Sequence, residues 1–371
     1  LMYSDLLANL NPEQREAVTL PPVNASGQAQ SALILAGAGS GKTRVLTTRI
    51  AWLIQTGQVS PIGVLAVTFT NKAAKEMMVR LSAMLPINTR GMWIGTFHGL
   101  CNRLLRAHHK EAGLPSTFQI LDTQDQLSAI KRLLKSLKVD DEKYPPKQLQ
   151  YFIAHAKERG QRAKDISAGD DFGAKMAQLY AAYDEQCQRE GVVDFAELLL
   201  RSYELLKHSE PIRTHYQERF RHILIDEFQD TNALQYAWLK LLSGHDASRV
   251  NVSGMGSSSV FAVGDDDQSI YAFRGADVEN MRLFEKQFHP MLVKLEQNYR
   301  STGRILDSAN ALIANNPHVI EKRLWSSLGR GDPLTVLHHK DDVHESSINP
   351  SRGGNRGESF NHQGPPDTKT F

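Results

Sequence analysis

The feature that most constrains the fold is a glycine-rich loop, AGAGSGKT, at residues 36–43. An apolar run, ALIL, precedes this loop and predicts a short buried strand, while apolar residues recur with helical spacing from residue 45 to residue 53. A strand, a glycine-rich loop and a helix in this order are typical of a phosphate-binding loop. Backbone N–H groups and the helix N-terminus then form a cradle for an anion. The sequence therefore predicts a nucleotide-binding site here.

The loop residues have predicted roles in binding a nucleotide and its metal ion. Lys42 is expected to reach the β- and γ-phosphates, and the Thr43 hydroxyl is expected to coordinate Mg²⁺. The usual pattern begins with glycine, whereas this chain has Ala36, and alanine is the smallest substitute. A glycine-rich turn with a chance lysine is the alternative, but the flanking strand and helix disfavour it. The predicted phosphate-binding residues are Ala36, Gly37, Ala38, Gly39, Ser40, Gly41, Lys42 and Thr43.

Composition excludes several other classes of protein. With 43 basic and 41 acidic residues and a formal net charge of +2, any nucleic-acid surface has to be local. The two cysteines, Cys101 and Cys187, give no disulfide framework, and no Cys/His group has the spacing of a zinc site. No apolar run approaches the roughly 18 residues that span a membrane, and the N-terminus lacks a signal-peptide layout. We expect a cytoplasmic protein without membrane contact.

Further apolar segments predict an α/β architecture. Segments that begin at residues 63, 92, 222, 261, 292 and 333 are predicted strands. Helical patterns alternate with most of them, which favours a parallel, doubly wound sheet. From about residue 100 to residue 219 no buried strand is predicted. Helical periodicity at 124–137, 146–159, 172–190 and 195–206 instead indicates a helical insertion, whose basic residues we interpret mainly as solvated charges.

A pair of carboxylates follows the predicted strand that begins at residue 222. The sequence HILIDE places Asp226 and Glu227 at the end of this strand. In nucleoside triphosphatases, one such acid holds Mg²⁺ and a neighbouring group orients or deprotonates the attacking water. We assign the first role to Asp226 and the second to Glu227. Thr70 and Asn71 also follow a strand, at the sheet edge where α/β proteins bind ligands.

Polar and aromatic residues near three other segments suggest contacts to the base and to nucleic acid. Asn11 and Pro12 predict a helix start, and the Gln14 amide in its first turn is suited to an adenine edge; an exposed helix glutamine is the alternative. Gln268, beside the 261 strand, suggests a γ-phosphate sensor. Tyr271, Phe273 and Arg274 suggest a base-stacking platform, with core aromatics as the alternative. After the 292 strand, Tyr299 suits adenine stacking and Arg300 an arginine finger.

Several stretches of this chain occur in the same order in one family of motor proteins. They are LNPEQREAV, VTFTNKAAKEM, GTFHGL, VDFAELLLR, DEFQDT, GDDDQSIYAFRG and LEQNYRS. Together they make the chain similar to superfamily 1 DNA helicases of the UvrD/Rep/PcrA group, most of all to UvrD-type members, from about residue 10 to residue 337. The resemblance implies ATP hydrolysis with Mg²⁺ and 3′-to-5′ translocation along single-stranded DNA. It also implies unwinding at single-strand/duplex junctions and DNA repair proteins as partners.

The resemblance also assigns roles to individual positions. The nucleotide-contacting positions are Gln14, Lys42, Thr43, Arg44, Asp226, Glu227, Gln268, Tyr299 and Arg300. Of these, Lys42, Asp226, Glu227, Gln268 and Arg300 are the implied catalytic residues, with Thr43 and Asp226 as the metal ligands. The positions that match DNA-contacting motifs are Thr70, Asn71, Thr96, Phe97, His98, Tyr271, Phe273 and Arg274. The family usually has tryptophan at the position of Phe273, where stacking is expected to survive.

The implied fold is a RecA-like P-loop NTPase sheet with a helical insertion subdomain and the start of a second RecA-like domain. The implied units are motor domain 1A at 1–98 and 220–290, insertion 1B at 99–219, and the start of domain 2A at 291–343. Residues 344–371 are expected to form a disordered tail outside the family pattern. The segment 245–259 is longer than the family pattern. Because the family continues beyond the resemblance, the alternative function is a truncated nucleotide- and single-strand-binding fragment without motor activity.

Overall fold

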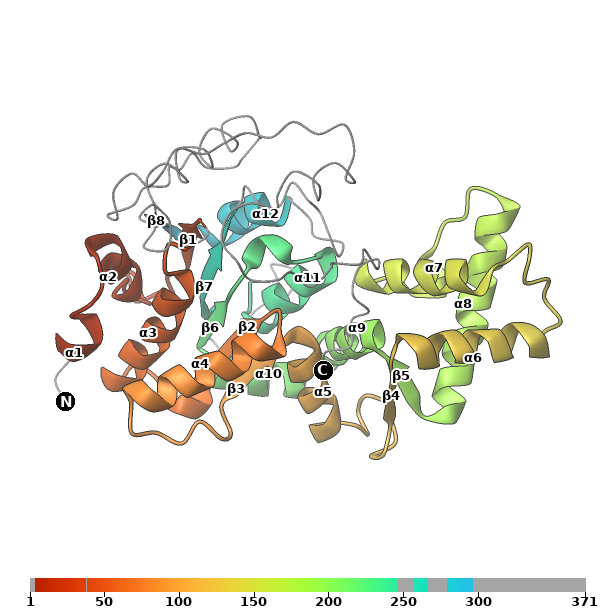
Figure 1. Ribbon diagram of the computed structural model, residues 1–371, viewed down its shortest axis with the longest axis horizontal. Helices are drawn as coiled ribbons and strands as arrows, with labels where there is room; N and C mark the ends of the chain where they lie inside the picture. Colours follow the sequence, from red (N-terminus) through yellow and green to blue (C-terminus); the bar gives the residue numbers. More distant parts are fainter. Residues whose placement is uncertain (1–3, 38, 246–255, 266–278, 296–371) are drawn as a thin grey trace, which may run out of the picture.

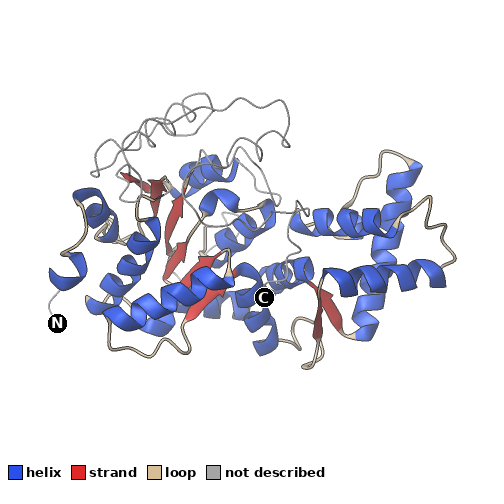
Figure 2. Cartoon of the chain, in the orientation of Figure 1, coloured by secondary structure: helices blue, strands red, loops and turns tan. Residues whose placement is uncertain are grey.

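A six-stranded sheet forms the centre of the structure, a computed structural model that describes residues 4–37, 39–245, 256–265 and 279–295 (Figure 1). The strands lie in the order β3-β2-β6-β7-β1-β8, and every pairing among them is parallel (Figure 2). This confirms the predicted parallel α/β sheet. The strand bounds are β1 Ala32–Ala36, β2 Val64–Thr68, β3 Trp93–Thr96, β6 His222–Ile225, β7 Ser259–Gly264 and β8 Met291–Leu295.

Helices cover both faces of this sheet because its strands are apolar on both sides. Along β1, Leu33 and Leu35 belong to one hydrophobic core, and Ile34 and Ala36 belong to the other. None of the described helices is long and apolar enough to cross a membrane. The helices beside the sheet are α1 Ser4–Leu7, α2 Pro12–Val18, α3 Lys42–Gln55, α4 Asn71–Met84, α5 Phe97–Ala107, α9 Phe195–His208, α10 Glu210–Arg219, α11 Ala233–Leu242 and α12 Glu279–Phe288, with 3-10 turns η1 Pro61–Gly63 and η3 Phe228–Asp230.

Side-chain caps start several helices directly after strands. The Thr70 hydroxyl accepts a hydrogen bond from the backbone N–H of Ala73 (3.0 Å) at the start of α4. The Thr96 hydroxyl accepts one from Gly99 (3.1 Å) at the start of α5. Such caps satisfy backbone donors that the first helical turn leaves unpaired. They also fix the chain direction where each strand ends, so these polar residues stay at the carboxyl edge of the sheet.

A separate helical lobe projects from one end of the sheet domain (Figure 1). It contains α6 Thr123–Ser136, α7 Pro146–Glu158, η2 Ala163–Asp165 and α8 Asp171–Glu190, which share a hydrophobic core of their own. The helices predicted near 124–137, 146–159 and 172–190 are thereby confirmed. No buried strand was predicted between residues 100 and 219, and the structure adds one short pair there, in which the partly exposed β4 Gln119–Leu121 pairs in parallel with β5 Val192–Asp194. Each has three residues, too few to give a period.

Two sets of contacts cross the predicted unit boundaries. Helices α5 and α9 pack into the core of the sheet domain through residues such as Leu104 and Leu206, although the sequence assigned 99–219 to the insertion. At the other boundary, β8 pairs with β1 as the edge strand of the same sheet, whereas the sequence began a second motor domain at residue 291. The sheet therefore extends at least to Leu295. The strand predicted at 333 and the tail at 344–371 lie outside the described residues.

A buried ionic network joins the helical lobe to the sheet domain. The Lys157 ammonium on α7 lies 2.9 Å from Asp194, 3.1 Å from Glu197 and 3.2 Å from Asp184. Burial opposes the charge of Lys157, yet these carboxylates raise its pKa well above the ordinary value. Arg162 pairs with Glu197 and Asp184 as well. Asp194 also caps α9 by accepting the Glu197 N–H at 2.7 Å. These charges hold α7, α8 and α9 together. We call this cluster, which consists of Lys157, Arg162, Asp184, Asp194 and Glu197, the joint.

Replacing Asp194 with alanine is expected to lower the free energy of unfolding by about 3–5 kcal/mol, because buried Lys157 would lose its nearest carboxylate and α9 would lose its N-cap. Urea denaturation followed by circular dichroism measures this change. The matched control is Arg132→Ala, which removes a solvent-exposed pair with Glu190 (3.1 Å) and should cost less than about 1 kcal/mol. Equal effects of the two changes would contradict a structural role for the joint.

Candidate nucleotide-binding site

The candidate site lies at the carboxyl edge of the sheet, where the strand order brings two loops together. β7 lies between β1 and β6, so the glycine-rich loop after β1 and the acidic turn after β6 emerge side by side. Lys42 from the first loop and Glu227 from the second meet there, with the lysine Nζ 2.7 Å from the Glu227 Oε1. Two residues that are 185 positions apart in the sequence therefore form one polar centre.

The glycine-rich loop turns tightly between β1 and α3 through two glycines with positive φ angles. Gly39 and Gly41 have φ angles of 74° and 83°, in the left-handed region that glycine adopts without strain. The Ser40 hydroxyl donates to the Gly37 carbonyl (2.6 Å) and closes the turn. Gly41 precedes the first residue of α3, so the loop leads directly into the helix N-terminus. Ala36 ends β1 as a buried residue, and Ala38 lies outside the described residues.

Gln14 supports this loop from α2. Its side-chain Oε1 accepts the Asn11 N–H (3.0 Å) in a capping box, and its Nε2 donates to the Ser40 carbonyl (3.2 Å). The alternative of an exposed helix glutamine is wrong, because Gln14 is 1% exposed. A Cβ atom at Gly41 would lie only 2.3 Å from the Gln14 Nε2. Contact with the phosphate loop is thus established for this amide, while adenine recognition stays a prediction.

The acidic turn after β6 holds its two carboxylates in different environments. Asp226 is buried, and burial, followed by the nearby Glu227 charge, raises its pKa to about 6 against the opposing effect of Lys42. Its Oδ1 accepts the Glu227 N–H at 2.8 Å. Glu227 has a φ angle of 49°, a left-handed conformation that costs a non-glycine residue about 1–2 kcal/mol. The turn thus directs one carboxylate inward and the other toward Lys42.

The structure adds Gln229, a residue for which sequence reasoning proposed no role. Its Nε2 donates to the Glu227 Oε2 (2.6 Å), and its Oε1 accepts the Asp265 N–H (2.9 Å) beyond the end of β7. The amide therefore ties the turn after β6 to the chain leaving β7. Its position within DEFQDT, two residues after Glu227, was the available signal, but sequence spacing does not show which polar atoms meet.

The donor atoms at this edge suit Mg²⁺. Thr43 lies in the first turn of α3 and Asp226 at the end of β6, and both offer the oxygen ligands that this hard cation prefers. Among the described residues, no group of three or more His, Cys, Asp or Glu side chains is placed to hold a metal ion. Protein sites for Mg²⁺ commonly supply one or two side chains and leave the remaining positions to water and substrate phosphates. The residues present fit an ion that binds with a nucleotide.

Some of the residues predicted to contact DNA are accessible to a ligand, and others are buried. Thr70 and Asn71 are exposed at the start of α4, and Thr96 is half-buried at the start of α5. Phe97, at 2% exposure, packs against other core aromatic rings, so the predicted DNA contact does not fit its placement. His98 is half-buried beside the Phe195 ring, and burial lowers its pKa despite the nearby charge of Asp194.

Other predicted site residues are exposed or lie outside the described part of the chain. Arg44 is an exposed residue in the first turn of α3. The residues outside the described ranges are Gln268, Tyr271, Phe273, Arg274, Tyr299 and Arg300. Their roles in sensing phosphate, stacking on bases and stabilising charge therefore stay predictions.

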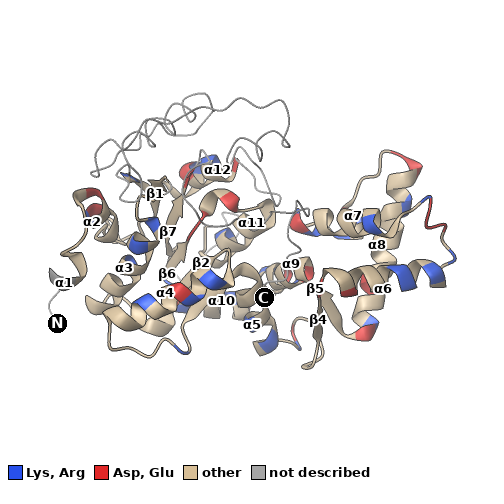
Figure 3. Ribbon diagram, in the orientation of Figure 1, with Lys and Arg blue, Asp and Glu red and all other residues tan. Residues whose placement is uncertain are grey.

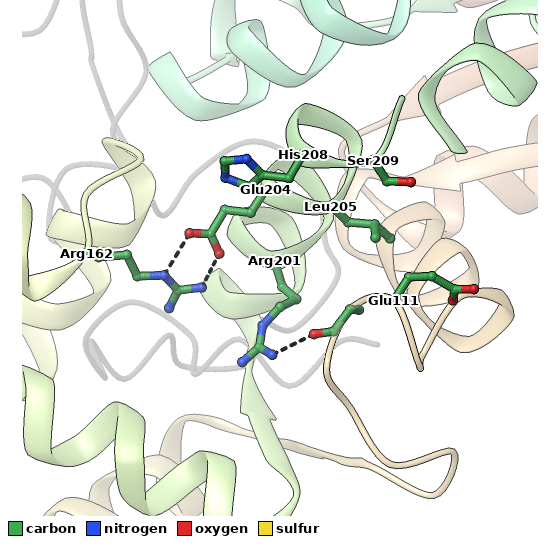
Figure 4. Close-up of a pocket in the computed structure, with 8 residues that line it drawn as sticks. Glu111, Arg162, Arg201, Glu204, Leu205, His208 and Ser209 are labelled. Carbon is green, nitrogen blue, oxygen red and sulfur yellow. Dashed lines mark hydrogen bonds and ion pairs between the residues drawn. The ribbon is translucent and has the colours of Figure 1, made fainter. Parts of the chain in front are cut away.

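A cavity of about 420 Å³ lies at the joint, away from the phosphate loop (Figure 4). Arg162 and Arg201 point into it, but Glu204 binds Arg162 at 2.6 Å, and the Ala112 carbonyl binds Arg201 at 2.8 Å. Because both guanidinium groups are already satisfied by the protein, the cavity belongs to the joint and offers no free cation to an anionic ligand.

Two family models match this chain in tandem. Residues 10–289 match the UvrD/REP helicase N-terminal domain, and residues 293–349 match the UvrD-like helicase C-terminal domain. The second match ends beyond residue 343, where the sequence resemblance was expected to stop. Over 280 residues, from 10 to 289, the first match covers most of the 371-residue chain.

Three similar proteins carry helicase names. The chain is 50% identical over 335 residues to DNA helicase II of Escherichia coli and 48% identical over 353 residues to DNA helicase II of Haemophilus influenzae. It is 40% identical over 344 residues to the ATP-dependent DNA helicase PcrA of Bacillus subtilis. These alignments cover 90%, 93% and 91% of this chain but 44%, 46% and 44% of the relatives. The chain thus spans less than half the length of these relatives.

Gly41→Ala is expected to weaken nucleotide binding roughly tenfold or more, because alanine is strained in this left-handed conformation and its methyl group would displace the Gln14 amide from the loop. Titration with a fluorescent ATP analogue measures the affinity. Gly57→Ala is the matched control, since Gly57 has a φ angle of 74° with open space around it, and its change should leave affinity intact. Retained affinity in the Gly41 variant would argue against the loop as the site.

Asp226→Asn is expected to stabilise the chain without nucleotide at pH 7.5 by about 1–3 kcal/mol. The folded pKa of about 6 lies above the ordinary value of 3.8, so the penalty for ionising Asp226 grows as pH rises and fades as pH falls toward 4. Urea unfolding of both proteins at pH 7.5 and pH 5 measures the difference. Asp140→Asn, at an exposed position, should show no such pH dependence. A stabilisation by Asp226→Asn that is larger at pH 5 than at pH 7.5 would contradict the raised pKa of Asp226.

Proposed function

We propose that this chain, which belongs to the UvrD/REP helicase family, binds ATP with Mg²⁺ at the phosphate loop and hydrolyses it. The activity is proposed to drive 3′-to-5′ movement along single-stranded DNA and unwinding at single-strand/duplex junctions in DNA repair. The observation that supports this proposal best is the contact between Lys42 and Glu227, because it joins a phosphate-binding lysine to a carboxylate placed to act on water.

The same contact suggests how the site changes when ATP enters. In the structure, Lys42 is paired with Glu227. A γ-phosphate is a stronger partner for the lysine because it carries more negative charge, so Lys42 would donate to a phosphate oxygen instead. The released Glu227 carboxylate can then accept a proton from the attacking water. Gln229 keeps hold of the other Glu227 oxygen and limits the orientation of the carboxylate.

Mg²⁺ would be held by the Thr43 hydroxyl and Asp226, and it would neutralise charge that develops on the phosphates. Asp226 has to be ionised for this role, and its pKa of about 6 leaves it largely ionised at pH 7.5. The raised pKa is useful because a buried carboxylate that is costly to ionise gains more from a cation than a solvated one does.

Binding of a single strand is proposed at the same carboxyl edge. Thr70 and Asn71 follow β2, the strand next to β6, and Thr96 ends β3, one strand further from β6. Because β6, β2 and β3 are hydrogen-bonded neighbours, a displacement of the β6 end during hydrolysis would also displace these residues. Repair proteins as partners and a location in the cytoplasm follow from the proposed role in DNA repair and stay proposals with it.

Glu227→Gln is expected to lower ATP hydrolysis stimulated by single-stranded DNA by about 100-fold or more, because an amide cannot accept the proton of the attacking water. Affinity for ATP should be kept, since Lys42 loses a competing charged partner. A coupled phosphate-release assay with an oligo-dT strand measures turnover. Glu76→Gln, at an exposed position on α4, is the matched control and should hydrolyse ATP normally.

Unchanged hydrolysis in the Glu227 variant would refute its assignment. A wild-type chain that binds ATP and the strand without stimulated turnover would instead favour the alternative function, a nucleotide- and single-strand-binding module without motor activity.

A further inference from the structure

One exposed face of α7 carries a regular stripe of cationic and aromatic side chains. Lys147, Tyr151, His155 and Arg159 follow one another at every fourth position, and all four are exposed. Residues four apart lie on the same face of a helix, so they form a single row. We call this row the α7 stripe. Arg159 follows the last helical residue directly and closes the row at its C-terminal end. Figure 3 colours the lysine and arginine positions along the α7 ribbon blue.

The opposite face of α7 fixes the direction of the stripe. Leu149, Ile153 and Ala156 are buried in the core of the helical lobe. Because these residues anchor the helix, α7 cannot turn the stripe inward without exposing its own apolar face. The stripe is therefore a permanent surface feature of the lobe.

The centre of the stripe is a preformed aromatic platform. The rings of Tyr151 and His155 stack with an interplanar angle of 9° and centroids 5.8 Å apart. Tyr151 is 72% exposed, which is unusual for a side chain with such a large apolar ring. An exposed, flat ring that a neighbour already orients can stack on a ligand ring with little further loss of side-chain freedom.

The ends of the stripe supply positive charge. Neither Lys147 nor Arg159 forms an ion pair within the described part of the chain. Glu158, half-buried between them, is the acidic residue on this side of the helix. The net charge of the row is therefore positive, and its two cations flank the aromatic pair. Cations beside stacked rings suit a ligand that alternates phosphates with flat bases.

We propose that the α7 stripe binds unpaired bases and phosphates of single-stranded DNA. Successive stripe residues are about 6 Å apart along the helix, and the whole row spans about 18 Å, enough for several extended nucleotides. The occupant is a single strand because the bases of a duplex are stacked on each other and cannot reach the Tyr151 ring. The inference rests on the proposed function in one respect, which is that DNA is the ligand.

The position of α7 connects the stripe to the motor domain. The end of α7 packs against α11, where Gly160 lies beside Leu234. Helix α11 begins shortly after the Asp226–Glu227 turn. Arg159 is thus the stripe residue nearest to the sheet domain, and a strand bound along α7 is directed toward the edge that holds the nucleotide site.

Tyr151→Trp provides a direct test in the full chain. Stacking on DNA bases quenches indole fluorescence, so the variant should show more quenching than wild type when oligo-dT is added. The same anisotropy titration with labelled oligo-dT should show wild-type or tighter affinity for Tyr151→Trp. Tyr151→Ala should weaken binding roughly tenfold, because stacking of one base is lost. Tyr151→Leu, which keeps apolar bulk without a ring, should weaken binding similarly.

Two controls separate the stripe from general charge and from folding. Lys147→Ala should weaken binding and reduce its salt dependence, whereas Lys135→Ala, an exposed lysine on α6, should do neither. ATP-analogue affinity should stay unchanged in every variant, which shows that the motor domain is folded. A hairpin duplex of equal length should be bound equally by wild type and Tyr151→Ala.

Oligo-dT binding that is identical in wild type and Tyr151→Ala, with no added quenching in Tyr151→Trp, would overturn the inference and assign the stripe to another partner or to solvent. That result would leave the proposed function standing, because DNA would still bind elsewhere. Loss of stimulated ATP hydrolysis in Glu227→Gln tests that function separately.

Discussion

The ion pair between Lys42 and Glu227 depends on the order of the strands in the sheet. β1 and β6 flank β7, and parallel pairing brings their carboxyl ends to one edge. The glycine-rich loop and the acidic turn then emerge close enough for a 2.7 Å contact. The apolar faces of β1 keep this order, because each face is buried under a separate group of helices. The geometry of the site is thus a consequence of packing far from it.

Amide side chains complete the site by linking loops that the sheet alone does not join. Gln14 binds the Ser40 carbonyl of the phosphate loop, and Gln229 binds both Glu227 and the backbone beyond β7. An amide can donate and accept at once, so each glutamine joins two segments without adding charge. Each amide therefore fixes the relative position of the two segments that it joins. The joint at Lys157 separately holds the helical lobe against α9 of the sheet domain.

Sequence alone predicted the parts of this structure that depend on local pattern. The phosphate loop, the strand that ends at Asp226 and the helices of the lobe all have strong periodicity or fixed spacing. It did not predict the β4–β5 pair, because three-residue strands have no period. Nor could it show that Phe97 faces the core or that Gln14 is buried, since motif membership does not reveal side-chain direction. The ionic joint depends on residues brought together only by tertiary packing.

The central claim is that the loop after β1 and the turn after β6 form one nucleotide site. The most direct test is a crystal structure of the chain with Mg²⁺ and a non-hydrolysable ATP analogue. We expect the Lys42 ammonium to leave Glu227 and to contact a phosphate oxygen, with the metal ion beside Thr43 and Asp226. A nucleotide bound elsewhere, or a lysine still paired with Glu227 in the occupied site, would contradict it.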